Sequence, residues 1–411
     1  MSKIKQKAPK LRFPEFTDDW EQSKLGDVGN TYTGLSGKTA DDFGHGEANF
    51  ITYMNVYSNN IADPTMVSPI EIDEKQHEVE VGDVFFTTSS ETPDEVGMSC
   101  VLKEKQGIVY LNSFCFGFRP TKSFDLNFLA YMLRSNYVRN QIKILAQGVS
   151  RYNISKTKMM DISIIFPDYE EQKKIGEYFS NLDNLITIHQ RKCDELKEFK
   201  KGMFQKMFPK KGETIPEIRF PGFTDAWEQR KVGELLIERN EQAPMNEEYP
   251  LMAFIANEGV APKGERYDRS SLVTDTENKL YKRTEFGDFI YSSNNLETGS
   301  IGLNKYGKAC ISPVYSIFHP TGIADSNFLG RRLVRKDFIN SMVKWRQGVI
   351  YGQWRIHESD FLKIEISVPS VKEQRQIGTF LDYLDNLITL HQRKVDEYKE
   401  LKKGLLQQMF I

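Results

Sequence analysis

An internal duplication constrains the fold of this chain more than any other feature of its sequence. The opening segment Arg12–Gln22 recurs as Arg219–Gln229 with two substitutions. Toward the end of each half, residues 183–191 recur as 385–393 with one substitution. Self-similarity of this kind indicates two copies of one structural unit within the 411 residues.

The two copies differ most in their middles. Residues 30–80 and 235–285 share little sequence, whereas the ends of each half are nearly identical. A constant frame with different inserts is expected of a protein that recognises two different targets with one geometry. Neutral drift in surface loops is the alternative explanation of the same pattern.

Composition places the chain among folded proteins of two or three domains. Of its residues, 39% are hydrophobic and 27% charged, which provides enough apolar material for packed cores. Because the net charge is −2, a nucleic-acid-binding surface would require uneven placement of charge. The four cysteines form no Cys-x-x-Cys pair, and no apolar run approaches the roughly 20 residues of a membrane span. We expect a reduced, cytoplasmic protein.

Each half is predicted to begin with a β-rich globular domain and to end in a long helix. The patterns favour strands at 81–88, 162–167, 286–291 and 364–369 and shorter helices near 126–146 and 326–346. The fold class is therefore α+β.

The long helices have readable starts. Asp168 with Glu171, and Ser370 with Glu373, have the spacing of a capping box, in which an N-cap oxygen precedes a glutamate by three residues. About 40 residues then follow without proline, which makes a rod of roughly 60 Å. The predicted divisions are a first globular domain at 1–167, a first helix at 168–208, a linker at 209–217, a second globular domain at 218–369 and a second helix at 370–411.

Heptad spacing predicts that the two helices pair as an antiparallel coiled coil, which would give the chain pseudo-twofold symmetry. His189 and His391 fall in the middle of the seam, where we interpret them as polar residues that fix the register. A metal site there is the alternative, but no further ligands support it. The predicted seam residues are Ile175, Leu182, Leu185, His189, Leu196, Phe199, Ile377, Leu384, Leu387, His391, Tyr398 and Leu401.

Catalytic motifs are missing from the sequence. Residues 34–39 resemble a phosphate-binding loop, but Tyr32 stands where that motif requires its first glycine. The sequence has no His-Glu-x-x-His or Gly-x-Ser-x-Gly motif, and no Asn-Pro-Pro-aromatic motif of the kind that adenine methyltransferases use. These absences predict a chain with no catalytic residues, no metal and no cofactor of its own.

The order of the duplicated motifs resembles the specificity (S) subunit of type I restriction-modification systems. Both copies carry Arg-Phe-Pro-x-Phe-Thr-Asp-x-Trp, Gly-Asp before a strand, Gln-Gly-Val, and Pro-x-x-x-Glu-Gln-x-x-Ile, which spans Pro167–Ile175 and Pro369–Ile377. The resemblance covers nearly the whole chain. It implies two target-recognition domains, each of which binds one half of a split DNA sequence, at a separation set by the coiled coil.

The same resemblance implies the partners. Two methyltransferase (M) subunits would dock on the helices and would carry S-adenosylmethionine, and motor-nuclease (R) subunits would complete the complex. The chain itself would bind double-stranded DNA without chemistry. Two other hypotheses remain: a self-contained DNA-modifying enzyme with an unrecognised active site, and a two-headed scaffold that binds proteins instead of DNA.

Residues that contact DNA should be polar, basic or aromatic and should lie on loops, at similar places in both copies. An aromatic residue beside arginine precedes the last strand of each half, and polar pairs follow the Gly-Asp strands. The candidates are Lys38, Thr39, Ser89, Ser90, Arg151, Tyr152, Asn153, Lys263, Arg266, Asn294, Asn295, Tyr351, Gln353, Trp354 and Arg355.

Overall fold

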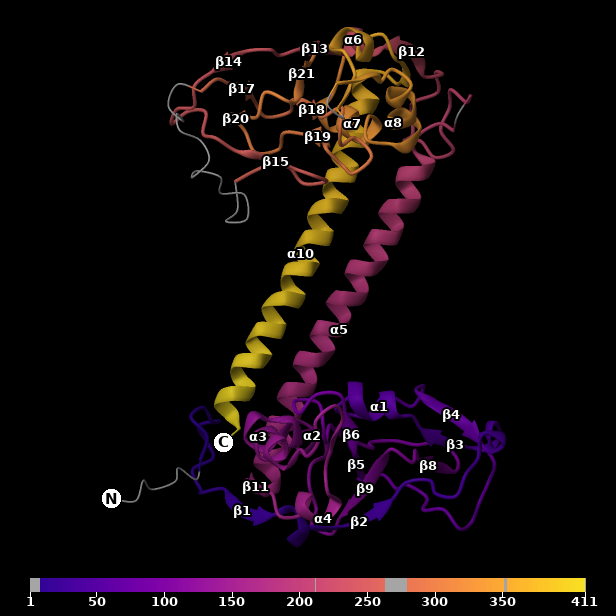
Figure 1. Cartoon of the computed structure of the whole chain (residues 1–411), viewed down its shortest axis with the longest axis vertical. Coiled ribbons are helices and arrows are strands. Elements are labelled where there is room, and N and C mark those ends of the chain that lie inside the picture. The colour runs from indigo at the N-terminus through magenta and orange to yellow at the C-terminus, as the bar shows by residue number, and fades with distance from the viewer. Residues whose placement is uncertain (1–7, 211, 263–278, 351–352, 411) are drawn as a thin grey trace. The chain divides into compact units, whose positions relative to one another are not determined.

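The computed structural model describes residues 8–210, 212–262, 279–350 and 353–410. Contacts divide the chain into two compact units. The first contains Met1–Arg191 with Gln392–Ile411, and the second contains Lys192–His391. Each unit therefore holds one globular head and one segment of each long helix, α5 (Tyr169–Lys206) and α10 (Val371–Met409) (Figure 1).

The first head is built on a four-stranded antiparallel sheet in the order β2-β9-β5-β7, with a smaller sheet in the order β4-β3-β8. Its strands are β1 (Glu21–Lys24), β2 (Gly29–Thr33), β3 (Phe43–Ile51), β4 (Val67–Ile70), β5 (Val84–Thr87), β6 (Ser89–Ser90), β7 (Ser99–Val101), β8 (Val109–Leu111), β9 (Cys115–Pro120), β10 (Tyr152–Asn153) and β11 (Ser163–Phe166). Its helices are η1 (Leu25–Asp27), η2 (Ala40–Asp42), α1 (Tyr53–Ser58), α2 (Leu126–Arg134), α3 (Asn136–Leu145) and α4 (Lys156–Met159).

The second head repeats the four-stranded sheet in the order β13-β21-β18-β19 and adds a sheet in the order β14-β17-β20. Its strands are β12 (Glu228–Lys231), β13 (Leu236–Glu238), β14 (Gln242–Ala243), β15 (Ala253–Ile255), β16 (Gly259–Ala261), β17 (Tyr281–Thr284), β18 (Phe289–Tyr291), β19 (Ile301–Leu303), β20 (Ala309–Ile311), β21 (Ser316–Pro320), β22 (Gln347–Ile350), β23 (Gln353–Arg355) and β24 (Glu365–Val368). Its helices are α6 (Val232–Leu235), α7 (Ser326–Arg332), α8 (Lys336–Val343) and α9 (Glu358–Phe361).

One expected element differs in both heads. The helix predicted over 126–146 is two helices, α2 and α3, because Ser135 adopts an extended backbone and its hydroxyl accepts the amide of Val138 as the N-cap of α3. The helix predicted over 326–346 is likewise divided into α7 and α8.

The predicted capping boxes are only half present. The Asp168 carboxylate accepts the amide of Glu171 at 3.0 Å, and the Ser370 hydroxyl accepts the amide of Glu373 at 3.4 Å. The glutamates do not return a bond to the N-cap. Instead Arg12 holds Glu171 through two bonds of 2.7 Å, and Arg219 holds Glu373 at 2.7 and 2.8 Å. A bidentate guanidinium is a stronger partner for a buried carboxylate than a backbone amide.

The glutamine that follows each of these glutamates explains the rest of the duplicated motif. Gln172 donates to the carbonyl of Pro167 at 2.9 Å and accepts the amide of Asp125 at 3.1 Å. Gln374 makes the same two bonds in the second unit, to Pro369 and Asp325. Because Asp125 and Asp325 are the N-caps of α2 and α7, the glutamine joins the start of each long helix to a helix of its head.

The duplicated Gly-Asp dipeptides also have a structural role. Asp83 is buried and accepts two bonds from Arg119, at 2.8 and 2.9 Å. Asp288 is buried beside Arg239, whose Nε lies 2.9 Å from its carboxylate. Arg119 belongs to β9, whereas Arg239 follows β13, the neighbour of the equivalent strand. The ion pair is retained although its cation comes from a different strand.

Within each unit the two long helices run antiparallel. In the first unit Lys402 of α10 donates to Asp183 of α5 at 2.6 Å, and the rings of His189 and Tyr398 lie 5.7 Å apart. In the second unit Lys200 of α5 forms the equivalent ion pair with Asp385 of α10. The antiparallel coiled coil predicted from the heptads is therefore present in each unit.

The helix ends complete the core of each head. Phe410, which follows α10, packs edge-on against the buried Trp20 of the first head. Phe208, which follows α5, packs in the same way against Trp227 of the second head. The tryptophan of each opening motif is therefore a packing residue that receives the end of the neighbouring helix.

The predicted seam residues form two rows on each long helix, one that contains Ile175 and Leu182 and one, three residues later, that contains Leu185 and Phe199, and the two rows differ in burial. Ile175, Leu182, Ile377 and Leu384 are buried, and His189, Leu196, His391, Tyr398 and Leu387 are partly buried. Leu185, Phe199 and Leu401, however, are 37%, 51% and 45% exposed.

In the structure the buried second row lies four residues after the first, whereas the sequence predicts it three residues after. The buried side chains there are Phe179, Cys193, Met207, Leu381, Val395 and Met409. Steps of three and four alternate in a heptad, so both spacings fit the sequence and the packing of the helices decides between them.

Gly176 provides a test of this architecture. A Cβ at this position would clash with the Asp125 carboxylate and lie 2.7 Å from the amide of Phe128, whereas a Cβ at Gly202, on the same helix, would meet nothing within 4 Å. We expect Gly176→Ala to destabilise the chain by about 2 kcal/mol and Gly202→Ala to stabilise it by up to about 1 kcal/mol. Urea unfolding would measure both, and an equal effect of the two substitutions would contradict this packing.

Candidate nucleic-acid interface

The structure brings together two groups of candidates in the first head that lie far apart in the sequence. Strand β6 pairs with β10, so that Ser90 lies opposite Tyr152 and Ser89 opposite Asn153. The serine side chains are buried, whereas Asn153 is exposed. Arg151, just before β10, is also exposed and forms no ion pair within the described part of the chain. Tyr152 is half-buried, so the exposed candidates of this segment are Arg151 and Asn153.

The second head has a different surface at the equivalent place. The hairpin β22-β23 precedes Ile356, whose amide donates to the hydroxyl of Ser293 at 3.0 Å. Asn294 and Asn295 follow in an exposed turn after β18, and Arg355 is exposed at the end of the hairpin.

Several candidates fall outside what the structure describes. Lys263, Arg266 and Tyr351 lie outside the described residues. Gln353 and Trp354 belong to β23, but their side chains are likewise outside the description.

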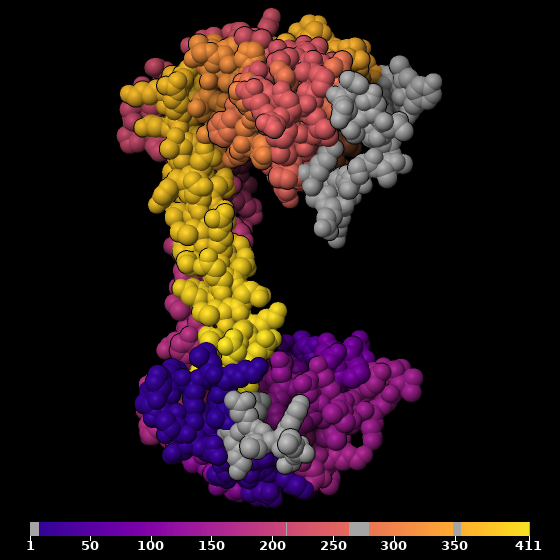
Figure 2. All heavy atoms as spheres, turned by 90° about the vertical axis from the view of Figure 1, so that its left-hand side faces the viewer, coloured from indigo at the N-terminus to yellow at the C-terminus, as the bar shows by residue number. Residues whose placement is uncertain are grey.

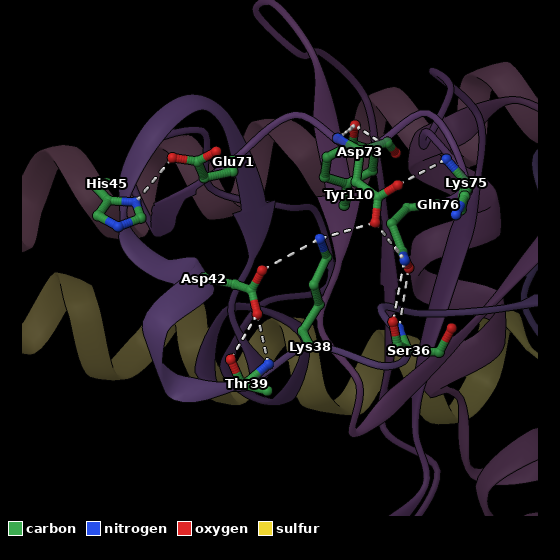
Figure 3. Close-up of polar contacts among 10 residues, drawn as sticks. All are labelled: Ser36, Lys38, Thr39, Asp42, His45, Glu71, Asp73, Lys75, Gln76 and Tyr110. Carbon is green, nitrogen blue, oxygen red and sulfur yellow. Dashed lines mark hydrogen bonds and ion pairs between the residues drawn. The ribbon is translucent and has the colours of Figure 1, made fainter.

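Lys38 and Thr39 are engaged in contacts within the first head. Figure 3 shows the Lys38 amine between two carboxylates, 2.9 Å from Asp73 and 3.7 Å from Asp42. The Thr39 amide and hydroxyl both donate to Asp42, at 2.7 and 2.9 Å. The hydrogen bond with Lys38 holds the pKa of Asp73 well below its usual range. These two side chains therefore stabilise the loop that carries them.

Helix α1 adds residues that the sequence analysis missed. The rings of Tyr53 and Tyr57 stack with centroids 6.0 Å apart. The Tyr53 hydroxyl donates to the carbonyl of Ser89 at 2.9 Å, which joins α1 to β6 (Figure 1). Met54 on the same helix is 52% exposed. The Tyr-x-x-x-Tyr spacing, which places two rings on one face of a helix, was the signal available in the sequence.

A half-buried arginine, Arg134, binds the end of α1. Arg134 Nη2 donates to the carbonyls of Val56, Tyr57 and Asn59 at 2.9, 3.0 and 2.6 Å, and its Nε donates to Ser99 at 2.7 Å. A guanidinium carries five donors in one plane, so one side chain can bind the last carbonyls of a helix and a strand together.

A second arginine, Arg139, is buried and binds the adjacent loop. Arg139 donates to the carbonyls of Gly97, Asp94 and Val96, at 2.7, 2.9 and 2.7 Å. Burial lowers the pKa of both Arg134 and Arg139 to about 10, so both guanidinium groups stay charged at neutral pH. Together they hold α1, which is bonded to β6, and the loop that follows β6.

The second head lacks both arginines. Val334 and Ile339 stand at the equivalent positions of the duplication. The turn after β18 is held there by other contacts, among them an ion pair of 3.1 Å between Arg346 and Glu297. The two candidate surfaces therefore differ in their supports as well as in their exposed side chains.

No group of three or more histidine, cysteine or acidic side chains among the described residues is arranged to hold a metal ion. All four cysteines are buried thiols, and burial raises the pKa of Cys100 and Cys115 to about 12, which keeps them protonated. No helix in the described ranges is long and apolar enough to span a membrane.

Comparison with known proteins identifies the family. The family model for the type I restriction modification DNA specificity domain matches residues 17–198 and 224–400. Because these two ranges cover most of the chain, the protein belongs to this family and carries two copies of its domain.

Individual relatives agree with this assignment. The chain is 24% identical to a putative type I restriction enzyme MjaX specificity subunit from Methanocaldococcus jannaschii, over 97% of this chain and 94% of the relative. It is 23% identical to the type I restriction enzyme MjaVIII specificity subunit of the same organism, over 68% of this chain and 67% of the relative. A crystal structure of the type I restriction-modification system S subunit from M. genitalium has the same fold, with a TM-score of 0.59 and 13% identity, over 98% of this chain and 99% of that one.

The arginine supports make a prediction for the first head. We expect Arg134→Met to raise amide hydrogen exchange at least tenfold in residues 52–59, because the last carbonyls of α1 lose their donor. Hydrogen exchange followed by mass spectrometry would measure this. Arg151→Met, which removes an exposed arginine from the same surface, should leave the segment unchanged. Equal protection in wild type and Arg134→Met would contradict the supporting role.

Proposed function

We propose that this chain is the DNA sequence-recognition subunit of a type I restriction-modification complex. Each head contacts one half of a bipartite site, and the site is asymmetric because the two surfaces differ. One observation carries the proposal: the same frame presents different exposed residues at the same place in both copies, on β6-β10 in the first unit and on the β18 turn with β22-β23 in the second.

The exposed side chains suit the chemistry of base edges. Arginine binds guanine through two donors, and asparagine binds adenine through a donor and an acceptor. Arg151 and Asn153 are the proposed contacts of the first head, and Asn294, Asn295 and Arg355 those of the second. The buried Ser89 and Ser90 and the engaged Lys38 and Thr39 are assigned supporting roles instead.

The long helices have two proposed roles. Helices of 38 and 39 residues are each about 57 Å long or slightly more, and both continue from one unit into the other. Such stiff elements suit a fixed separation of the two half-sites, about one turn of DNA or 34 Å.

Exposed apolar residues on the helices support the second role, docking of methyltransferase subunits. Leu185, Ile188 and Phe199 lie along one stripe of α5 and are 37%, 52% and 51% exposed. Leu390 and Leu401, at the positions of α10 equivalent to Ile188 and Phe199, are 51% and 45% exposed. Figure 2 shows side chains of α10 open to one face of the molecule. Several exposed apolar side chains along one stripe of a surface helix are typical of a protein interface.

This docking implies that recognition and chemistry belong to different subunits. We propose that two methyltransferase subunits carry S-adenosylmethionine and perform the reaction, that motor-nuclease subunits join the full complex, and that the chain described here supplies recognition alone. The purified chain should transfer no methyl group from labelled S-adenosylmethionine to DNA without the methyltransferase, and transfer by the chain alone would show that it is an enzyme.

Variants of the two surfaces test the proposed function. In a complex with the methyltransferase, Arg151→Ala with Asn153→Ala should weaken discrimination at bases of one half-site only, by about tenfold for each lost base contact. Asn294→Ala with Asn295→Ala should affect only the other half-site. Competition binding with duplexes altered in one half at a time measures both effects. Loss at both half-sites from either variant would contradict the assignment of one half-site to each head.

A further inference from the structure

A lysine-lined cleft lies at the same place in each unit, where the head meets the paired helices. In the first unit the cleft has a volume of about 490 Å³ and is lined by Lys399, Lys402 and Lys403 of α10, Asp183 of α5 and Arg134 of the head. We call it the first lysine cleft.

The second lysine cleft has a volume of about 680 Å³ and is lined by Lys197, Lys200 and Lys201 of α5 and Asp385 of α10. Val334, at the position of the head equivalent to Arg134, lines it as well. The two clefts therefore contain the same three lysines and the same aspartate of the duplicated helices, with the helices exchanged.

One lysine in each cleft is structural. Lys402 is bound to Asp183, and Lys200 is bound to Asp385. The other lysines are directed to solvent. Within the described ranges, Lys197, Lys201 and Lys403 form ion pairs only with acidic residues of their own helix, three residues earlier, at N–O distances of 3.8, 3.3 and 4.0 Å.

The exposure of these lysines leaves them open to an external anion. The side chains of Lys197, Lys201 and Lys403 are 50%, 65% and 67% exposed. Lys399 is exposed and forms no ion pair with any residue that the structure describes. Exposed ion pairs of this kind are weak and exchange readily for a stronger anionic partner. Each cleft thus offers two lysines to such a partner.

Each cleft is linked through one of its lining residues to a proposed recognition loop. Arg134 lines the first cleft and binds the end of α1, whose Tyr53 is bonded to β6, the partner strand of β10. Asn257 lines the second cleft, and its amide donates at 3.0 Å to the carbonyl of Gly299, in the turn that follows β18. An anion in either cleft would therefore bind a part of the head that is connected to a recognition loop.

We propose that each lysine cleft binds the phosphate backbone of DNA beside the half-site that its head contacts. This inference rests on the proposed function and extends it from the heads to the helices. Lysine is a flexible point charge that neutralises phosphate without sequence preference. The clefts would add affinity and fix position, while the loops supply specificity.

Salt-dependent binding tests the proposal. Two double variants are prepared as complexes with the methyltransferase: Lys399→Ala with Lys403→Ala, and Lys197→Ala with Lys201→Ala. Each complex is titrated with a duplex that contains the target site and with a duplex that lacks it. Each double variant should weaken binding to both duplexes by the same factor, about tenfold, and reduce the slope of log affinity against log salt by between one and two. Lys200 and Lys402 are left intact because they hold the helix pair.

A matched control and two outcomes decide the result. Lys192→Ala with Lys394→Ala removes two lysines that have similar contacts within their own helices but line neither cleft, and it should change neither affinity nor slope. Unchanged DNA binding by a cleft variant that still assembles with the methyltransferase would overturn the proposal. A cleft variant that no longer copurifies with the methyltransferase would also overturn it, because the clefts would then be protein-docking sites. Ile188→Glu, on the exposed stripe of α5, serves as the reference for such a loss of copurification. A wild-type complex with no preference for its target would instead disprove the proposed function.

Discussion

The buried pairing of one arginine with one glutamate is the interaction on which each unit depends. Arg12 and Glu171 are 159 residues apart in the sequence, and the glutamate side chain is wholly buried. Arg219 and Glu373 form the same pair in the second unit. A buried carboxylate that lost its cation would cost several kcal/mol, so neither partner can change alone. The pair joins the opening segment to the first turn of the long helix, and the next residue, Gln172 or Gln374, joins that turn to a helix of the head.

This arrangement explains why the ends of the two copies are alike and their middles are not. The shared motifs position the head on its helices through a few buried residues, among them Trp20, Glu171 and Gln172. The recognition surfaces are attached to that frame by contacts that depend little on loop sequence, such as the arginine bonds to carbonyl groups of α1. Every residue has a carbonyl, so a loop can change its side chains and still be held. The second head, with Val334 and Ile339 in place of those arginines, shows that the supports can change as well.

Much of the fold could be predicted from the duplication. The long helices, their caps, the antiparallel pairing and the strand before each proline follow from spacing and local chemistry. The sequence predicts the second seam row one residue early because Leu185, Phe199 and Leu401 are as apolar as core residues, and only the packing in the fold distinguishes the two registers. The engagement of Lys38 with Asp73 depends on residues that meet only in the fold. Arg134 and Arg139 look like surface residues of a helix in the sequence, because nothing local shows that they turn inward to backbone carbonyls.

The central claim is that this one chain determines a split DNA target. Mapping methylated adenine across the host genome, with the gene intact and with it deleted, tests that claim most directly. The account predicts one asymmetric bipartite motif that is methylated only when the gene is present. An unchanged methylation map, in cells that express the partner methyltransferase, would contradict it.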